Sequence, residues 1–215
     1  MNYLVLDIST SAQVGIEDSP YLSWACKKGA KTPEEAYSKA GLHAEYGMVC
    51  GLSAFWVKFK TKNDEVLSYE VEPAMTSTCI TLEQEEQTLR ELLRLIYGKQ
   101  VIFVGQNSKK FIIPFLAKRL LSYGFKIPEQ IYSAIHSGSI DIMEELACGG
   151  VSVMSLRSSA WLLGLNDPRS SMRVPDFYEL CNRGQTKEIE IFTETNARVA
   201  AAVFGNCVLG NLIKL

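Results

Sequence analysis

One stretch of the chain has the shape of an active-site element without the acid that such an element carries. The sequence VGQNSKKFIIPFLAKRL, residues 104–120, begins at the end of an apolar strand, turns at Gly105 and continues as an amphipathic helix. Asn107 stands at the helix start, where its side chain could cap the helix. A polar or acidic group is expected where such a helix begins beside a strand tip, yet position 112 is Ile.

Two other groups of residues could take part in chemistry with this stretch. Asp7 and Ser9 follow an apolar strand, and Phe192 and Asn196 lie one turn apart on a long helix. Each group also has an ordinary structural interpretation. Asp7 could simply cap a strand end. Phe192 and Asn196 could belong to a core stripe that they share with Ile189, Val199 and Val203.

The elements that must position these residues predict one continuous α/β domain over residues 1–215. Strands are expected at 2–8, 48–59, 65–71 and 99–104, and the Asn63-Asp64 turn makes 48–72 a hairpin. Thr32 and Thr81 are expected to cap helices. Strand–helix–strand spacing around 99–104 implies parallel neighbours. Further helices are expected at 107–123, after an extended piece within 137–148, and at 155–164, 174–182 and 185–212, with a loop at 166–173.

Composition narrows the class of protein. The 215 residues are 47% hydrophobic and 21% charged, with a formal net charge of −2. This charge argues against a protein that holds nucleic acid by bulk electrostatics. No apolar run approaches the length of a membrane span, and the N-terminus does not resemble a signal peptide. Two His and six scattered Cys do not predict a zinc site. Scattered cysteines without a secretion signal indicate reduced, mostly buried thiols and a cytoplasmic location.

The order of these elements resembles a known family. The segments LVLDIST, GQNSKKFIIPFL, SIDIMEEL, SLRSSAWLLGL and IEIFTETNARVAAAVF follow one another as in the DnaQ-like 3′–5′ exonucleases. The chain is most similar to the branch related to the exonuclease domain of B-family DNA polymerases. The resemblance covers nearly the whole chain. It implies a ribonuclease-H-like mixed sheet, with three antiparallel strands followed by parallel strands, flanked by helices.

The chain departs from the family at its catalytic motifs. The family has Asp-x-Glu at its first strand, and here Asp7 matches whereas Ser9 replaces the Glu. The second motif is Asn-x-x-x-Phe-Asp. Asn107 and Phe111 match it, and Ile112 replaces the acid.

The third motif of the family, Tyr-x-x-x-Asp, has lost both functional groups. Phe192 keeps the ring without its hydroxyl, and Asn196 is the amide of the expected acid. Such enzymes cleave phosphodiesters with two metal ions about 3.5–4 Å apart. Mg²⁺ and Mn²⁺ need carboxylate ligands, of which only Asp7 remains. We therefore expect no intact catalytic residue and no metal at the vestigial site, which comprises Asp7, Ser9, Ile112, Phe192 and Asn196.

Three functions remain open. The first is a catalytically inactive exonuclease-like module that binds nucleic acid or a protein. The second is an active exonuclease whose Mg²⁺ or Mn²⁺ site combines Asp7 with Asp141 or Glu194. Against it, Asp141 could equally be a helix N-terminus, and Glu194 should point away from Asn196 on a helix. The third is a purely structural subunit.

The resemblance also indicates which residues and partners to consider. The implied partners are single-stranded DNA or RNA, or a protein in a replication or nuclease assembly, with no membrane involved. A solvated surface is the ordinary interpretation of the basic positions. The candidate nucleic-acid-binding residues are Asn107, Lys109, Lys110, Arg169 and Arg173, with Arg157 as a further basic position.

Overall fold

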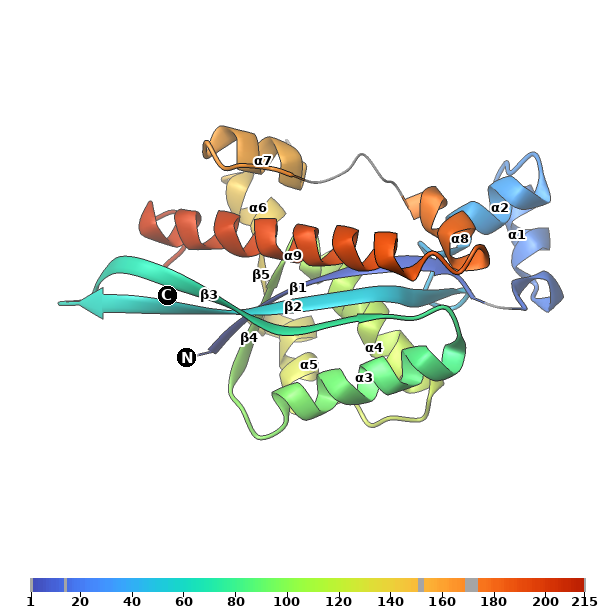
Figure 1. Cartoon of the computed structure of the whole chain (residues 1–215), viewed down its shortest axis with the longest axis horizontal. Helices are drawn as coiled ribbons and strands as arrows, with labels where there is room; N and C mark the ends of the chain where they lie inside the picture. Colours follow the sequence, from blue (N-terminus) through green and yellow to red (C-terminus); the bar gives the residue numbers. More distant parts are fainter. Residues whose placement is uncertain (1, 14, 151–152, 169–173, 215) are drawn as a thin grey trace.

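A computed structural model describes residues 2–13, 15–150, 153–168 and 174–214. The described residues form a five-stranded mixed sheet in the order β3-β2-β1-β4-β5 (Figure 1). β1 is antiparallel to β2, β2 is antiparallel to β3, and β4 runs parallel to both β1 and β5. The predicted α/β fold, with three antiparallel strands followed by parallel strands, is confirmed. The strands are β1 (Asn2–Ala12), β2 (Gly47–Lys62), β3 (Glu65–Thr78), β4 (Val101–Gly105) and β5 (Ile140–Asp141).

Helices cover both faces of this sheet (Figure 1). One face carries α3 (Leu82–Ile96), α4 (Ile113–Ser122) and α5 (Glu129–Ser133). The long α9 (Thr186–Leu209) crosses the other face, beside α6 (Ile142–Leu146) and α7 (Leu156–Leu162). The remaining helices gather at one end of the molecule: α1 (Tyr21–Lys27), α2 (Pro33–Ala40) and α8 (Val174–Asn182).

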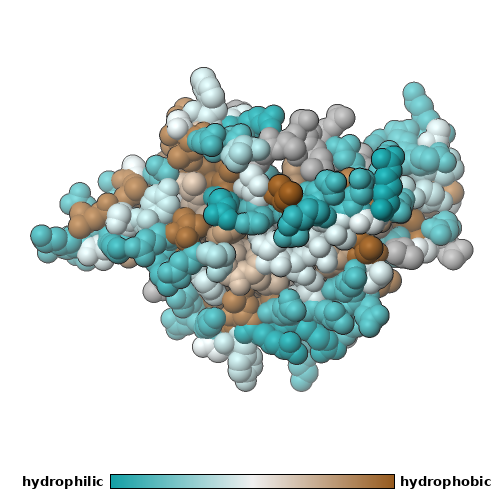
Figure 2. Space-filling model, viewed as in Figure 1, coloured by the Kyte–Doolittle hydropathy of each residue, from teal (hydrophilic) through white to brown (hydrophobic). Residues whose placement is uncertain are grey.

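The alternation of β1 divides the apolar interior into two cores. Leu4, Leu6 and Ile8 point toward the α3 and α4 side, where they pack with buried residues of both helices. Tyr3 and Val5 point the other way and pack against α9. The outer surface of α3 is hydrophilic (Figure 2), as expected for a helix whose apolar stripe faces a core.

The predicted helix starts and hairpin turn are confirmed. Thr32 accepts a hydrogen bond from the Glu35 N–H at 3.1 Å, with Pro33 as the first residue of α2. Thr81 accepts one from the Gln84 N–H at 3.2 Å at the start of α3. Asn63 and Asp64 both have positive φ, which is the conformation of a tight two-residue hairpin turn.

Several boundaries differ from the prediction. β1 continues five residues past Asp7, so this side chain does not cap a strand end. β3 also continues to Thr78, because it stays paired with β2 across a register shift near Pro73. The short α1 was not predicted, since its seven residues show too little apolar periodicity.

The helix expected from residue 107 begins differently. Residues Ser108–Ile112 form a π-helical turn, and α4 begins only at Ile113, with Pro114 in its first turn. Asn107 has φ of 60° and makes no side-chain capping hydrogen bond, so its predicted role as a cap is wrong.

Two further expectations can be compared with the structure. In the described part of the chain, no helix has the length and apolar character needed to cross a bilayer. All six cysteines are free thiols. The expectation that they would be mostly buried is half right, because Cys26 and Cys148 are exposed and Cys181 is partly exposed.

Candidate functional site

The structure brings Asp7 and Asn196 together. Asp7 lies on β1 and Asn196 on α9, and the Asn196 Nδ2 donates a hydrogen bond to the Asp7 Oδ2 at 3.1 Å. Both side chains are partly exposed. In a metal site two acids at these positions would share a cation. Here an amide donor contacts the remaining carboxylate.

Ser9 takes part in packing between the sheet and α9. Its Oγ lies 2.6 Å from the Oγ1 of Thr193, which donates to the Ile189 carbonyl at 2.8 Å. Because that bond uses the single hydroxyl hydrogen of Thr193, Ser9 is the donor to Thr193. Gly51 faces Ser9 across the sheet, and a Cβ there would lie 2.4 Å from the Thr193 Oγ1. Glycine at position 51 therefore allows α9 to lie this close to β2.

Thr193 was not identified from the sequence. It lies three residues before Asn196, so helical spacing alone places the two side chains on one face of α9. This helical spacing is the signal that could have found Thr193. Ser9 lies two residues from Asp7 on β1, so its partner on α9 is expected about one turn from Asn196, the partner of Asp7.

Ile112 and Phe192 serve as packing residues. Ile112 is 2% exposed and packs in the core that contains Leu6 and Ile8. A Cβ at Gly105 would lie 3.1 Å from the Ile112 Cδ1, so the glycine makes room for it. The Phe192 ring packs edge-on against Phe177 of α8, with ring centroids 5.2 Å apart.

Asp141 has a structural role that accounts for its burial. Its carboxylate is fully buried and accepts hydrogen bonds from three backbone N–H groups. The donors are Asn107 at 3.0 Å, Lys109 at 3.1 Å and Met143 at 3.1 Å. The last of these caps α6, as in the helix-start interpretation. Asp141 therefore fixes the turn after β4 to the start of α6.

The other charged candidates are engaged in ion pairs. Glu194 accepts from Arg198 at 2.6 Å, one turn further along α9. Lys109 and Lys110 each lie 3.1 Å from Glu144, on separate oxygens of its carboxylate. Hydrogen bonds from these two lysines lower the pKa of Glu144. Arg157 pairs with Asp167 at 3.3 Å. Arg169 and Arg173 lie outside the described residues.

The residues of the vestigial site do not fit a pair of divalent metal ions. Asp7 supplies one carboxylate, Asn196 directs an amide donor at it, and Ile112 presents only carbon. Among residues 2–13, 15–150, 153–168 and 174–214, no three His, Cys, Asp or Glu side chains are grouped closely enough to hold a metal ion. Hard cations such as Mg²⁺ require several oxygen ligands, which this arrangement does not offer.

Comparison with known proteins gives the fold. No family model matches the chain, and no curated protein matches it in sequence. Among solved structures, it is similar to the family B DNA polymerase from the hyperthermophilic archaeon Pyrobaculum calidifontis. The TM-score is 0.53 and the sequence identity 15%, over 97% of this chain. The chain spans 24% of the length of that polymerase.

Proposed function

We propose that this chain is an exonuclease-like domain that does not cleave nucleic acid and binds a single strand without metal. The polymerase-like fold supports a function related to nucleic acid. The observation that carries the proposal is the hydrogen bond between Asn196 and Asp7. It satisfies the remaining acid by a neutral donor of the protein itself, in a site where Ile112 offers no ligand.

The competing nuclease model lacks support from its additional ligands. It requires Asp141 or Glu194 to join Asp7 at a metal. Asp141 is fully buried and bonded to three backbone N–H groups, and Glu194 is paired with Arg198. Recruiting either carboxylate would break these interactions.

Weak binding with a small dependence on salt is the form of nucleic-acid interaction that the charges support. Lys109 and Lys110 share one carboxylate, so the cluster of these lysines with Glu144 keeps one net positive charge. Few phosphate contacts give a shallow dependence of affinity on salt. The loss of acids at the vestigial site reduces repulsion of phosphate as well.

A nuclease assay tests the absence of cleavage. End-labelled single- and double-stranded DNA and RNA are incubated with the protein in Mg²⁺ or Mn²⁺, beside a direct titration with Mn²⁺. We expect no shortening from the 3′ end and no saturable metal binding. Shortening that disappears in Asp7→Ala would overturn the proposal, whereas shortening that persists in Asp7→Ala identifies a contaminating nuclease.

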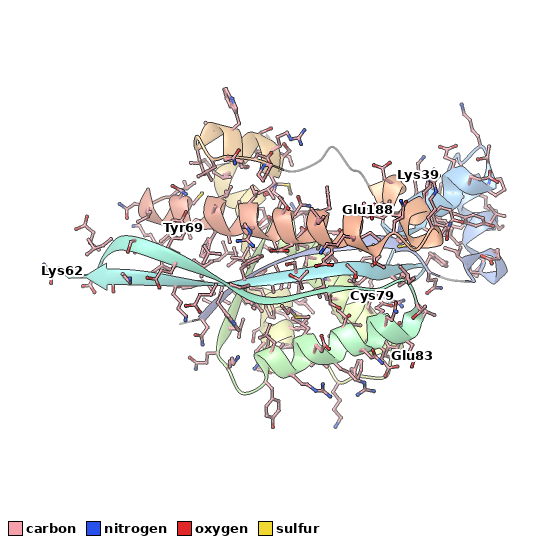
Figure 3. The ribbon with its side chains drawn as sticks, in the orientation of Figure 1. Lys39, Lys62, Tyr69, Cys79, Glu83 and Glu188 are labelled. Atoms are coloured by element: carbon pink, nitrogen blue, oxygen red, sulfur yellow. The ribbon has the colours of Figure 1, made fainter. Side chains whose placement is uncertain are left out.

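An anisotropy titration in chelator tests binding separately. We expect a labelled single strand to bind at low salt, and Lys109→Gln with Lys110→Gln to weaken binding and flatten its salt dependence. Lys62→Gln is the matched control, because Lys62 is the last residue of β2 and lies at the tip of the β2–β3 hairpin (Figure 3). If no strand binds at low salt, or if both variants weaken binding equally, the nucleic-acid role is wrong and a protein-interaction role replaces it.

A further inference from the structure

We propose that Cys50 of β2 and Cys181 of α8 form an oxidation site, in which a peroxide converts the two thiols into a disulfide. This site is independent of nucleic-acid binding and would join α8 covalently to the central sheet. The proposal rests on an irregularity of β2, on the packing around Cys50 and on a cavity beside Cys181.

A β-bulge directs Cys50 toward α8. Ser9 pairs with Gly51 and Thr10 pairs with Val49, which leaves Cys50 as the extra residue of β2. Regular alternation would place Cys50 with Leu52 and Ala54, in the core beside α3 and α4. The bulge turns its side chain to the opposite face instead, which is a known effect of such irregularities.

On that face Cys50 packs against residues of α8 and α9. It is completely buried, in a cluster with Phe177 and Ile189. Cys181 packs against this cluster from α8, one turn after Phe177. Two thiols from segments 131 positions apart in the sequence are thus brought into one apolar environment.

Only one of these two thiols is open to a small oxidant. Cys181 is partly exposed and lines a cavity of about 220 Å³. Ala12 and Met48 line the cavity on the side of the sheet, and Tyr178 and Asn182 line it on the side of α8. A peroxide can therefore reach Cys181, whereas Cys50 is shielded.

The acidities of the two thiols suit different steps. The Cys50 thiol lowers the pKa of Cys181, with a smaller contribution from the Ser11 hydroxyl. Burial raises the pKa of Cys50 well above its ordinary value. The thiolate is the nucleophile in such reactions, so Cys181 reacts first.

The chemistry balances with a peroxide as the only co-reactant. The Cys181 sulfur attacks one oxygen of the peroxide, the O–O bond breaks, and the products are a sulfenic acid and an alcohol or water. The Cys50 sulfur then attacks the Cys181 sulfur and displaces its hydroxyl. The Cys50 proton leaves with this hydroxyl as water. Each sulfur is oxidised by one electron, and the peroxide is reduced by two.

A third thiol provides a competing partner that the geometry disfavours. Cys79 lies where the chain leaves β3 for α3 (Figure 3), and its N–H donates to the Cys50 carbonyl at 2.9 Å. Its sulfur, however, lies 3.3 Å from the Thr88 Oγ1 of α3 and is completely buried. Burial raises the pKa of Cys79 to about 12, and burial also raises that of Cys50, so the contact of Cys79 with Thr88, and not its acidity, separates the two thiols.

Peptide mapping of the oxidised full-length chain tests the site. The background carries Cys26→Ser and Cys148→Ser, which remove the two exposed thiols and with them disulfides between molecules. Reduced protein is treated with hydrogen peroxide, remaining thiols are alkylated, and the digest is analysed by mass spectrometry. We expect a linked Cys50–Cys181 peptide that is lost on treatment with dithiothreitol.

Two variants separate the steps. In Cys50→Ala, dimedone should trap a sulfenic acid on Cys181, because the second thiol is missing. In Cys181→Ser, Cys50 should remain a free thiol, and the linked peptide should be absent. Cys79→Ser should still form the link.

The proposal is overturned if Cys181 in the background protein oxidises to the sulfinic acid without a link, if Cys50 pairs with Cys79, or if Cys181 does not react. These three readings use protein with both thiols intact, so they do not depend on the folding of a variant at position 50 or 181.

Discussion

Two carboxylates lie on opposite faces of the sheet, and their surroundings differ. Glu85 of α3 is completely buried and accepts four hydrogen bonds. The donors are the Val49 N–H at 2.8 Å, the Arg119 Nε and Nη2 at 2.9 and 2.6 Å, and the Tyr123 hydroxyl at 2.6 Å. Asp7 of β1 is partly exposed, and the described contact of its carboxylate is with the Asn196 amide.

The difference shows what a buried acid requires. An unpaired charge in the interior is costly, and it is tolerated only with a cation and with donors that satisfy its oxygens. The α3–α4 face supplies both to Glu85. At Asp7 the described contact is with a neutral amide, and Ser9, Ile112 and Asn196 add no further carboxylate.

The largest loss of stability is expected when the cation is removed from the buried pair of Glu85 and Arg119. Arg119→Met should lower the free energy of unfolding by about 3–5 kcal/mol, because it leaves Glu85 charged and uncompensated in the core. Urea denaturation followed by circular dichroism measures this loss. The double variant Glu85→Leu with Arg119→Met should lose much less, since it buries no lone charge. Equal losses in both variants would contradict the account of this pair.

Introducing acids at the vestigial site should make the stability of the protein depend on a divalent metal ion. Ser9→Glu, Ile112→Asp, Phe192→Tyr and Asn196→Asp together should lower stability without metal, because the carboxylates repel one another. Added Mn²⁺ should then restore about 2.7 kcal/mol at a hundred times its dissociation constant. Thermal unfolding with and without Mn²⁺ measures the effect, and the parent should show none. A folded variant whose melting temperature ignores Mn²⁺ and Mg²⁺ would show that these positions do not converge.

A single acid introduced at position 112 should show how much an unpaired buried carboxyl group destabilises the fold. Ile112→Asp should lower the free energy of unfolding by about 1–3 kcal/mol, because position 112 is buried among apolar side chains. Chemical denaturation measures it. Leu121→Asp is the matched control, since this α4 residue is 60% exposed and should change stability by at most about 0.5 kcal/mol. A neutral result at position 112 would argue against its burial.

The smallest effect is expected at Glu144, a partly exposed carboxylate that contacts two lysines. Lys109 and Lys110 lower the pKa of Glu144, so its ion pairs stabilise the fold above the unfolded pKa. This contribution is lost as pH falls through the folded pKa. Glu144→Gln should therefore cost a few tenths of a kcal/mol at about pH 7, and this cost should shrink as pH falls through the folded pKa. Urea midpoints measured from about pH 7 into acid test this, and a cost that does not shrink would require another cause.

Local signals account for the parts of the fold that could be predicted. The Thr32 and Thr81 caps, the Asn63-Asp64 turn and the apolar strands each depend on a few consecutive residues, and the structure contains all of them. The spacing of strand, helix and strand indicated parallel neighbours, whereas the mixed sheet as a whole was implied by the family resemblance. The residues of the vestigial site could also be identified from the sequence. The hydrogen bonds between their side chains could not be predicted.

Contacts between distant segments could not be read from the sequence. Glu85 and Arg119 lie on amphipathic helices, where a charged residue is normally taken as solvent-exposed, and 34 positions separate them. Asp141 looked like a helix start and is one, yet nothing local showed that it also binds the turn at Asn107 and Lys109. The bulge at Cys50 depends on how β2 pairs with β1, which is a property of the assembled sheet.

The hydrogen bond from Val49 to Glu85 ties one backbone amide of the sheet to a helix. Amide hydrogens in a strand normally exchange with solvent when the strand separates from its neighbour, whereas this one is released when α3 withdraws its carboxylate. The exchange rate of Val49 therefore reports the local opening of the α3–α4 layer. Neighbouring amides of β2 that bond to β1 report the opening of the sheet itself. Comparing the exchange rate of Val49 with those of its β2 neighbours thus distinguishes undocking of the helical layer from global unfolding.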